Sequence, residues 1–217
     1  MHIPVVALRP PPADERSLHF WNAFYPFALS LQENGSILMN KHDWLTFLPN
    51  IEAGYAPWLR DHGSLTLRIQ QRCATFSVRN AGNCLATAAY DETALLGLPP
   101  RKKIYTREVF LYANSMPVVF AHSVVAPKHL RGAWRVLQNL GNKPLGALLF
   151  SHPLVKRAPL HYKTLKPQHA LYQRAAKVLD AAPEHLWARR SLFTLHGTPL
   201  LVTEVFLPKI LLLTNPV

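Results

Sequence analysis

The strongest constraint on the fold is a segment near the C-terminus that predicts a long β-hairpin. Two runs of strand-forming residues, LWARRSLFTL and PLLVTEVFLP, flank the short stretch His196-Gly197-Thr198. Alternation along a strand directs successive side chains to opposite faces of a sheet. The segment therefore predicts two antiparallel strands that close the folded domain.

Glu204 is the one carboxylate in this largely apolar hairpin. In the predicted strand it shares a face with Leu200, Val202 and Phe206. Burying an unpaired, ionised carboxylate is too costly, so Glu204 requires a cationic partner, a bound proton or a ligand. A structural ion pair and a functional site both meet this requirement, and the hairpin alone does not choose between them.

Arg107 is a second charged residue on an apolar strand face. It lies in a predicted hairpin, residues 104–127, whose turn chemistry comes from Asn-Ser-Met-Pro at 114–117. Arg107 and Glu204 are therefore expected to line one partly buried pocket, in which the arginine can grip a ligand carboxylate by two hydrogen bonds. The alternative is a direct salt bridge between the two residues, with no ligand. The residues that share the predicted face of Arg107 are Tyr105, Val109 and Leu111.

The chain divides into an irregular N-terminal extension, residues 1–50, and a folded domain, residues 51–217. The extension holds Pro10-Pro11-Pro12 and the turn signal Asn34-Gly35-Ser36, but no sustained periodicity. With 217 residues, 49% of them hydrophobic, the chain can bury one sizeable core. It contains neither a run of about 18 apolar residues nor a signal peptide, so a cytoplasmic protein is expected.

The periodicity of the domain predicts an α+β fold. Adjacent hairpins with helices between them favour a single antiparallel β-sheet of about six strands, with helical excursions that cover an internal ligand pocket. Shorter strands are predicted at residues 64–68 and 74–78. Helices are predicted at residues 56–60, 130–140, from about 144–146 onward, and at 170–180.

The net charge narrows the choice of partners. A formal charge of +12 favours an acidic partner: nucleic acid, an anionic membrane surface or an anionic small molecule. The basic residues are scattered and form no long basic arm, so no nucleic-acid partner is expected. Transient contact with an anionic membrane surface is a further hypothesis that the charge motivates. The two cysteines, Cys73 and Cys84, are expected to be reduced.

Motifs for metal or cofactor chemistry are missing from the sequence. There is no His-Glu-x-x-His zinc motif, and the 11 histidines lack paired ligand spacing. No Walker loop, nucleophile elbow or dinucleotide-binding glycine motif occurs. No metal and no cofactor are therefore expected.

Four ordered segments closely resemble the chorismate pyruvate-lyase family. They are WLRDHGSLT, TREVFL, LGNKPLGALLF and WARRSLFTLHGTPLLVTEVFLP, and the match spans about residues 58–208. The resemblance implies a monomeric, cofactor-free lyase that converts chorismate to 4-hydroxybenzoate and pyruvate, the first committed step of ubiquinone biosynthesis. It also implies an antiparallel sheet whose internal site is covered by helical flaps.

The resemblance assigns roles to individual residues. Arg107 matches the family arginine that holds the ring carboxylate, and Glu204 matches the glutamate that meets the ring hydroxyl. These two are the expected catalytic residues, with orientation of the substrate favoured over a strict acid or base role for Glu204. Leu145 matches a leucine whose backbone contacts the ligand, and Leu65 stands where well-studied members carry methionine.

Three further residues are candidates for substrate binding. His122 stands where many members carry arginine, and it is expected on the same alternation as Arg107. There it would weaken the grip on an anion or make it pH-dependent. Arg68 or Lys143 is a candidate to neutralise the enolpyruvyl carboxylate, with a solvated surface role as the alternative for Lys143.

The alternative function is a non-catalytic, small-molecule effector-binding domain of the transcription-regulator type. Such domains resemble this sheet and could use the same arginine and glutamate to sense a ligand. A regulator of this type should carry a winged-helix DNA reader ahead of the sheet. Residues 1–50 are too short and irregular for one.

Overall fold

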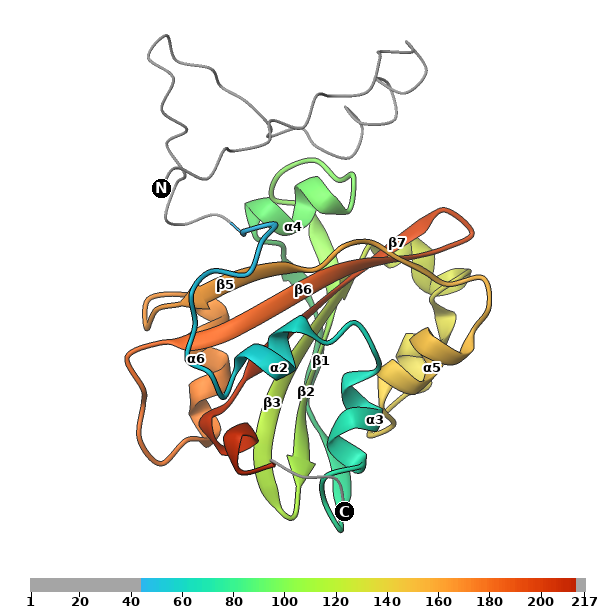
Figure 1. Ribbon diagram of the computed structural model, residues 1–217. Helices are drawn as coiled ribbons and strands as arrows, with labels where there is room; N and C mark the ends of the chain where they lie inside the picture. The colour runs from blue at the N-terminus through green and yellow to red at the C-terminus, as the bar shows by residue number, and fades with distance from the viewer. Residues whose placement is uncertain (1–43, 214–217) are drawn as a thin grey trace, which may run out of the picture. The chain divides into compact units, whose positions relative to one another are not determined.

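The computed structural model describes residues 44–213, which form one antiparallel sheet with helices on both faces (Figure 1). The sheet has seven strands in the order β1-β2-β3-β7-β6-β4, and β5 also pairs with β6. The predicted α+β fold with a single antiparallel sheet is confirmed. Most of the predicted extension, residues 1–43, lies outside the described residues. The strands are β1 (Phe76–Thr87), β2 (Lys103–Ala113), β3 (Met116–Val125), β4 (Lys156–Arg157), β5 (His161–Leu165), β6 (Leu186–Leu195) and β7 (Thr198–Phe206).

Short helices cover the two faces of the sheet. Helices α2 (Ala56–Arg60), α3 (Leu65–Gln70) and α5 (Leu145–Ser151) pack on one face, and α4 (Tyr90–Leu95) and α6 (Ala170–Ala175) pack on the other. Single turns of 3-10 helix, η1 (Pro127–Arg131), η2 (Arg135–Asn139), η3 (Ala176–Val178) and η4 (Pro208–Leu212), complete the connections. Within residues 44–213, no helix has the length and apolar character needed to cross a membrane.

Both predicted hairpins, β2–β3 and β6–β7, turn through two residues. Residues 114–115 and 196–197 have positive φ angles between 47° and 71°. Two consecutive residues in this left-handed region are typical of type I′ turns, whose twist matches that of the flanking strands. Asn114 and Gly197 suit this conformation, which explains why these turns could be located from the sequence.

A β-bulge interrupts the β2–β3 hairpin. Next to the turn, Ala113 pairs with Met116, but two residues further on Leu111 pairs with Val119. Val118 is thus an extra residue in β3. A one-residue shift of register moves every later side chain of that strand to the other face of the sheet.

The bulge corrects the expected position of His122. Without the extra Val118, His122 would lie opposite Arg107 and share its face. In the structure Arg107 pairs with Ser123, and His122 pairs with Glu108. The prediction that His122 lies on the same face as Arg107 is therefore wrong.

Residues 64–68, which were predicted as a strand, begin helix α3. The Ser64 hydroxyl caps the helix by accepting the Leu67 backbone N–H at 3.4 Å. Leu65 and Ile69, four residues apart, are buried, whereas Leu67 is 54% exposed. The prediction is wrong because an alternation of two leucines over five residues fits both a strand and a helix.

The other predicted elements are found with altered bounds or type. The helix at 56–60 is confirmed as α2, and a helix begins at Leu145 as expected. The helix predicted at 130–140 is instead the pair of 3-10 helices η1 and η2, which residues 132–134 separate. The helix at 170–180 is α6 followed by η3.

Candidate active site

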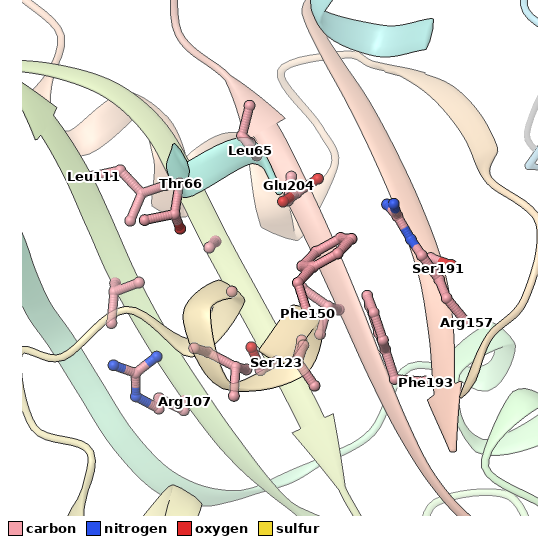
Figure 2. Close-up of a pocket in the computed structure, with 16 residues that line it drawn as sticks. Leu65, Thr66, Arg107, Leu111, Ser123, Phe150, Arg157, Ser191, Phe193 and Glu204 are labelled. Atoms are coloured by element: carbon pink, nitrogen blue, oxygen red, sulfur yellow. The ribbon is translucent and has the colours of Figure 1, made fainter. Parts of the chain in front are cut away.

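A cavity lies between the sheet and the first turns of helices α3 and α5 (Figure 2). Its volume is about 40 Å³. Strands β2, β3, β6 and β7 form its floor. Its charged or hydroxyl-bearing lining residues are Thr66, Arg107, Ser123, Arg157, Ser191 and Glu204. The rest of the lining is Leu65, Val109, Leu111, Ala121, Leu145, Gly146, Leu149, Phe150, Phe193 and Val202.

Arg107 is a buried cation with no carboxylate within ion-pair distance among residues 44–213. Its side chain is 1% exposed, and Nη2 donates to the carbonyl oxygens of Gly141 at 2.9 Å and Lys143 at 2.8 Å. Its Nε is buried without a partner in this part of the chain. Burial lowers the pKa of Arg107, but a guanidinium remains protonated at physiological pH. A buried cation with an unsatisfied donor beside a cavity is well suited to hold an anion.

The loop that holds Arg107 is itself fixed to the sheet. Gly141 has a φ of 50°, in the left-handed region that glycine adopts readily. The next residue, Asn142, accepts the backbone N–H of Asn80 in β1 through its Oδ1 at 3.0 Å. This bond ties the edge strand to the loop whose carbonyls position Arg107.

Glu204 is paired with an arginine, but the arginine is Arg189 and not Arg107. Arg189 in β6 lies directly opposite Glu204 in β7, and its Nε donates to Oε2 of Glu204 at 2.6 Å. Its Nη1 donates to the carbonyl oxygens of Trp58 at 2.8 Å and Asp61 at 2.5 Å, at the end of α2. Within residues 44–213 the other carboxylate oxygen, Oε1, has no hydrogen-bond partner, and the Glu204 side chain is 19% exposed.

Sequence reasoning missed Arg189, although the signal was present. The β6–β7 turn has two residues, so Leu195 pairs with Thr198. Counting six residues along each strand from the Leu195–Thr198 pair, away from the turn, reaches Arg189 and Glu204. Simple register counting is reliable in this hairpin because no bulge interrupts it.

Arg107 and Glu204 line the same cavity without contacting each other. On the two sides of β3, Arg107 lies opposite Ser123 and Glu204 lies opposite Ala121. With strands about 4.8 Å apart and a rise of about 3.4 Å per residue, the two Cα atoms are about 12 Å apart. The alternative of a direct salt bridge between them is excluded because Arg107 Nη2 is bound to the carbonyls of Gly141 and Lys143, whereas Glu204 pairs with Arg189.

Arg157, at the end of β4, is the second arginine that lines this cavity, and the sequence did not single it out. Its Nη1 donates to the His62 carbonyl at 2.7 Å, and its guanidinium lies 5.4 Å and 5.3 Å from the ring centroids of Phe150 and Phe193. Burial lowers its pKa, an effect that the negative charge of Glu204 opposes. In Figure 2 its guanidinium group lies beyond Glu204 as seen from Arg107.

Leu65 and Leu145 occupy equivalent positions on the two covering helices. Each is the first residue of its helix, α3 or α5, and each lines the cavity. The helices meet at Gly146, where an added Cβ would lie 2.8 Å from the Thr66 hydroxyl oxygen. Gly146 therefore permits the close contact that holds the two helices together over the cavity.

His122 lies in a separate ionic cluster on the other face of the sheet. It is 1% exposed, and its Nδ1 and Nε2 lie 2.9 Å from carboxylate oxygens of Glu108 and Glu92, respectively. Burial alone would lower the pKa of His122, but these two carboxylates raise it above the usual value. Glu108 also pairs with Arg174 at 2.6 Å. His122 is thus absent from the cavity lining, contrary to its candidate role in substrate binding.

The other candidate cations are occupied elsewhere. Arg68 pairs with Asp61 at 3.0 Å and lies over the ring of Trp58 at 4.8 Å, outside the cavity lining. Lys143 offers its backbone carbonyl to Arg107, while the residue itself is exposed. Within residues 44–213, no group of three or more His, Cys, Asp or Glu side chains is arranged to hold a metal ion.

The fold and cavity define an α+β protein with a cavity between one sheet face and two short helices, lined by two arginines and one glutamate. A family model described as chorismate lyase matches residues 38–214. The chain belongs to the chorismate lyase family.

Curated relatives agree with the family assignment. A protein of Nitrosospira multiformis, named "probable chorismate pyruvate-lyase", is 54% identical over 170 residues, which cover 78% of this chain and 94% of that protein. One of Nitrosomonas europaea with the same name is 54% identical over 70% of this chain and 86% of its own length. Among solved structures, the effector domain of PhnF from Mycobacterium smegmatis aligns with a TM-score of 0.46 and 11% identity, over 62% of this chain and 82% of that one.

Proposed function

We propose that this protein is a chorismate lyase that converts chorismate to 4-hydroxybenzoate and pyruvate. Family membership supports the proposal, and one observation carries it at the level of the site. Arg107, a buried cation with no carboxylate partner in residues 44–213, and Glu204 line one cavity with Cα atoms about 12 Å apart. The product has a carboxylate and a hydroxyl at opposite ends of a ring, which matches an arginine and a glutamate that reach it from opposite ends.

The reaction is an elimination driven by formation of an aromatic ring. Chorismate is a dianion whose cyclohexadiene ring carries a carboxylate, a hydroxyl and, on the carbon next to the hydroxyl-bearing carbon, an enolpyruvyl ether. The C–H bond at the hydroxyl-bearing carbon breaks, and its electron pair forms the new ring double bond. The adjacent C–O bond breaks, and its electron pair leaves on the enolpyruvyl oxygen. Protonation of this enolate at its methylene carbon gives pyruvate and takes up one proton, which equals the proton lost from the ring carbon, so the reaction balances without an oxidant or reductant.

In this proposal Arg107 orients the substrate through its ring carboxylate. Its guanidinium is already positioned by two backbone carbonyls, so little conformational freedom is lost when the anion binds. Charge-assisted hydrogen bonds in a site that excludes water are stronger than the same bonds in solution. Arg107 thus fixes the ring at one end.

Glu204 fixes the other end of the ring. Arg189 holds Oε2, which leaves Oε1 to accept a hydrogen bond from the ring hydroxyl. The carboxylate then lies beside the carbon that loses its hydrogen. We assign Glu204 the orientation of the hydroxyl-bearing carbon as its main role, since aromatisation supplies the driving force.

The two covering helices complete the proposed site. The first backbone N–H groups of a helix have no acceptor within the helix. Leu65 and Leu145 stand at these positions and line the cavity. We assign both of them backbone contacts to the bound ring, so that replacement of methionine by leucine at position 65 changes the contact little.

A direct assay tests the function. Purified protein incubated with chorismate should release 4-hydroxybenzoate and pyruvate in equal amounts, measured by chromatography and by coupling to lactate dehydrogenase. Arg107→Ala and Glu204→Ala should keep a folded circular dichroism spectrum and lose turnover, while the exposed-arginine control Arg131→Met should keep it. Absence of both products at high enzyme concentration would contradict the function, and full activity of an alanine variant would remove that residue from the site.

The proposal extends to the setting of the reaction: a cytoplasmic monomer that supplies 4-hydroxybenzoate to ubiquinone biosynthesis. Cys73 and Cys84 are free cysteines in the structure, and the proposed cytoplasmic setting would keep them reduced. The charge of +12 supports transient contact with an anionic membrane surface. Co-sedimentation with anionic but not neutral vesicles would support that contact, and equal absence of binding to both would contradict it.

A further inference from the structure

We infer that Arg157 forms a second anion subsite of the cavity and holds the carboxylate of the enolpyruvyl side chain. The inference rests on the proposed function and extends it to a residue that neither the resemblance nor the charge pattern indicated. Arg107 then binds the ring carboxylate at one part of the cavity, and Arg157 binds the side-chain carboxylate at another.

The position of Arg157 in the sheet supports this division. Arg107 is on β2 and Arg157 is on β4, and in the strand order both are separated from β7, which carries Glu204, by one intervening strand. The residue that contacts the ring hydroxyl therefore lies between the two arginines. In chorismate the enolpyruvyl ether is attached to the carbon next to the hydroxyl-bearing carbon, so its carboxylate can extend past the hydroxyl end of the ring, on the side of Glu204 away from Arg107.

The charges of the site support it as well. Arg189 neutralises Glu204 by a direct ion pair at 2.6 Å. Arg107 and Arg157 have no carboxylate within 4.0 Å among residues 44–213, so two positive charges remain at the cavity. Two unpaired cations are costly without a ligand, and a dianion neutralises both.

The surroundings of Arg157 keep its charge available for a ligand. One nitrogen is bound to the His62 carbonyl, and the buried Nε has no partner in the described part of the chain. Phe150 and Phe193 lie near the guanidinium and stabilise a cation without neutralising it. Glu204 and Asp61 act on Arg157 only through space, against the opposing charge of Arg189.

This placement gives Arg157 a role in the step that breaks the C–O bond. The electron pair of that bond moves onto the enolpyruvyl oxygen, next to the carboxylate that Arg157 holds. A guanidinium at this position stabilises the developing enolate until it is protonated to pyruvate. The other product, 4-hydroxybenzoate, lacks the second carboxylate and therefore gains nothing from Arg157.

The difference between the two ligands provides the test, because chorismate has the second carboxylate and 4-hydroxybenzoate does not. Arg157→Met should lower kcat/KM for chorismate by about 10- to 100-fold, as expected for loss of a charge-assisted hydrogen bond in a partly buried site. The same variant should bind 4-hydroxybenzoate with a Kd within about threefold of the wild-type value. Arg107→Met should lower kcat/KM for chorismate and also raise the Kd of 4-hydroxybenzoate. Arg131→Met, which removes an exposed arginine, should change neither.

A second measurement keeps the test independent of folding defects and of turnover. Calorimetry would compare two ligands, 3-(carboxymethoxy)-4-hydroxybenzoate and the uncharged-side-chain analogue 3-ethoxy-4-hydroxybenzoate. The wild-type protein should prefer the dicarboxylate, and Arg157→Met should lose at least about tenfold of that preference. An unchanged preference, or a parallel loss of affinity for both ligands, would overturn the subsite. Failure of the wild-type protein to turn over chorismate would instead count against the proposed function.

Discussion

Replacing Arg189 by methionine should destabilise the protein more than the same replacement of Arg107 or Arg157, the two arginines that line the cavity. Arg189 is fully buried and holds one carboxylate oxygen of Glu204 together with the carbonyls of Trp58 and Asp61. Removing one partner of a buried ion pair costs about 3–5 kcal/mol, because the other partner is left without compensation. For a domain of this size, each kcal/mol shifts Tm by roughly 2–4 °C, which gives a decrease of about 6–20 °C.

Arg107→Met is the matched control for this prediction. Arg107 is equally buried but has no carboxylate to leave unpaired among residues 44–213, and the two groups it releases are uncharged carbonyls of the exposed residues Gly141 and Lys143. The variant loses the hydrogen bonds of Arg107 but no longer buries its charge, and these two effects offset each other. Its Tm should therefore differ from that of the wild-type protein by no more than about 3 °C. Activity should nevertheless be lost.

Thermal unfolding followed by circular dichroism at one pH and ionic strength measures both variants. A decrease for Arg189→Met that is no larger than that for Arg107→Met would refute the reasoning. It would mean that the Glu204 carboxylate finds water or another cation once Arg189 is gone. Such a result would also imply that Glu204 does not depend on Arg189 for its orientation.

Two further predictions concern the helices over the cavity and the cluster on the other face. Gly146→Ala should force α5 away from Thr66, because the added Cβ would lie 2.8 Å from the Thr66 hydroxyl oxygen. Stopped-flow measurement should then show faster release of 4-hydroxybenzoate. An unchanged release rate would contradict a covering role for the contact between α3 and α5. His122 has a raised pKa, so its stabilising contribution should be complete below about pH 6.5 and lost as the pH rises through that raised value. Burial raises the pKa of Glu108, but the hydrogen bond with His122 and the charge of Arg174 lower it by more. The contribution of ionised Glu108 to stability should therefore be lost as the pH falls through this lowered pKa. The difference in Tm between the wild-type protein and His122→Gln should therefore shrink from pH 6 to pH 9, and a constant difference would show that the histidine is not stabilised by its charge.

The hairpins and the two charged residues on their apolar faces could be predicted because both depend on local rules. Asn114 and Gly197 suit left-handed turn positions, and period-two alternation placed Arg107 and Glu204 on the faces that line the cavity. The position of His122 could not be predicted in the same way. Val118 adds one residue to β3 next to Pro117, a residue type that sheets accept at bulges, but the proline alone does not determine whether the register shifts.

The other cations of the site required long-range information. Arg157 lies on a strand of two residues inside a Pro- and His-rich connection, a segment whose pairing with β6 has no periodic signal. Its neighbour His62 is 95 residues away in sequence, so only the folded chain brings the two together. Arg189, by contrast, was within reach of simple register counting across the hairpin.

The bonds between Arg189 and the end of α2 also determine how the cavity can open. Arg189 holds the carbonyls of Trp58 and Asp61, and α3 begins only four residues after Asp61, at Leu65. Helix α2 is thereby anchored to the same guanidinium that positions Glu204, whereas α3 is joined to Asp61 by a short connection, the Ser64 cap and the Arg68–Asp61 ion pair at 3.0 Å. Movement of α3 away from the cavity would therefore bend the chain between residues 61 and 65 and break this partly exposed ion pair, while Arg189 keeps the Glu204 carboxylate in place.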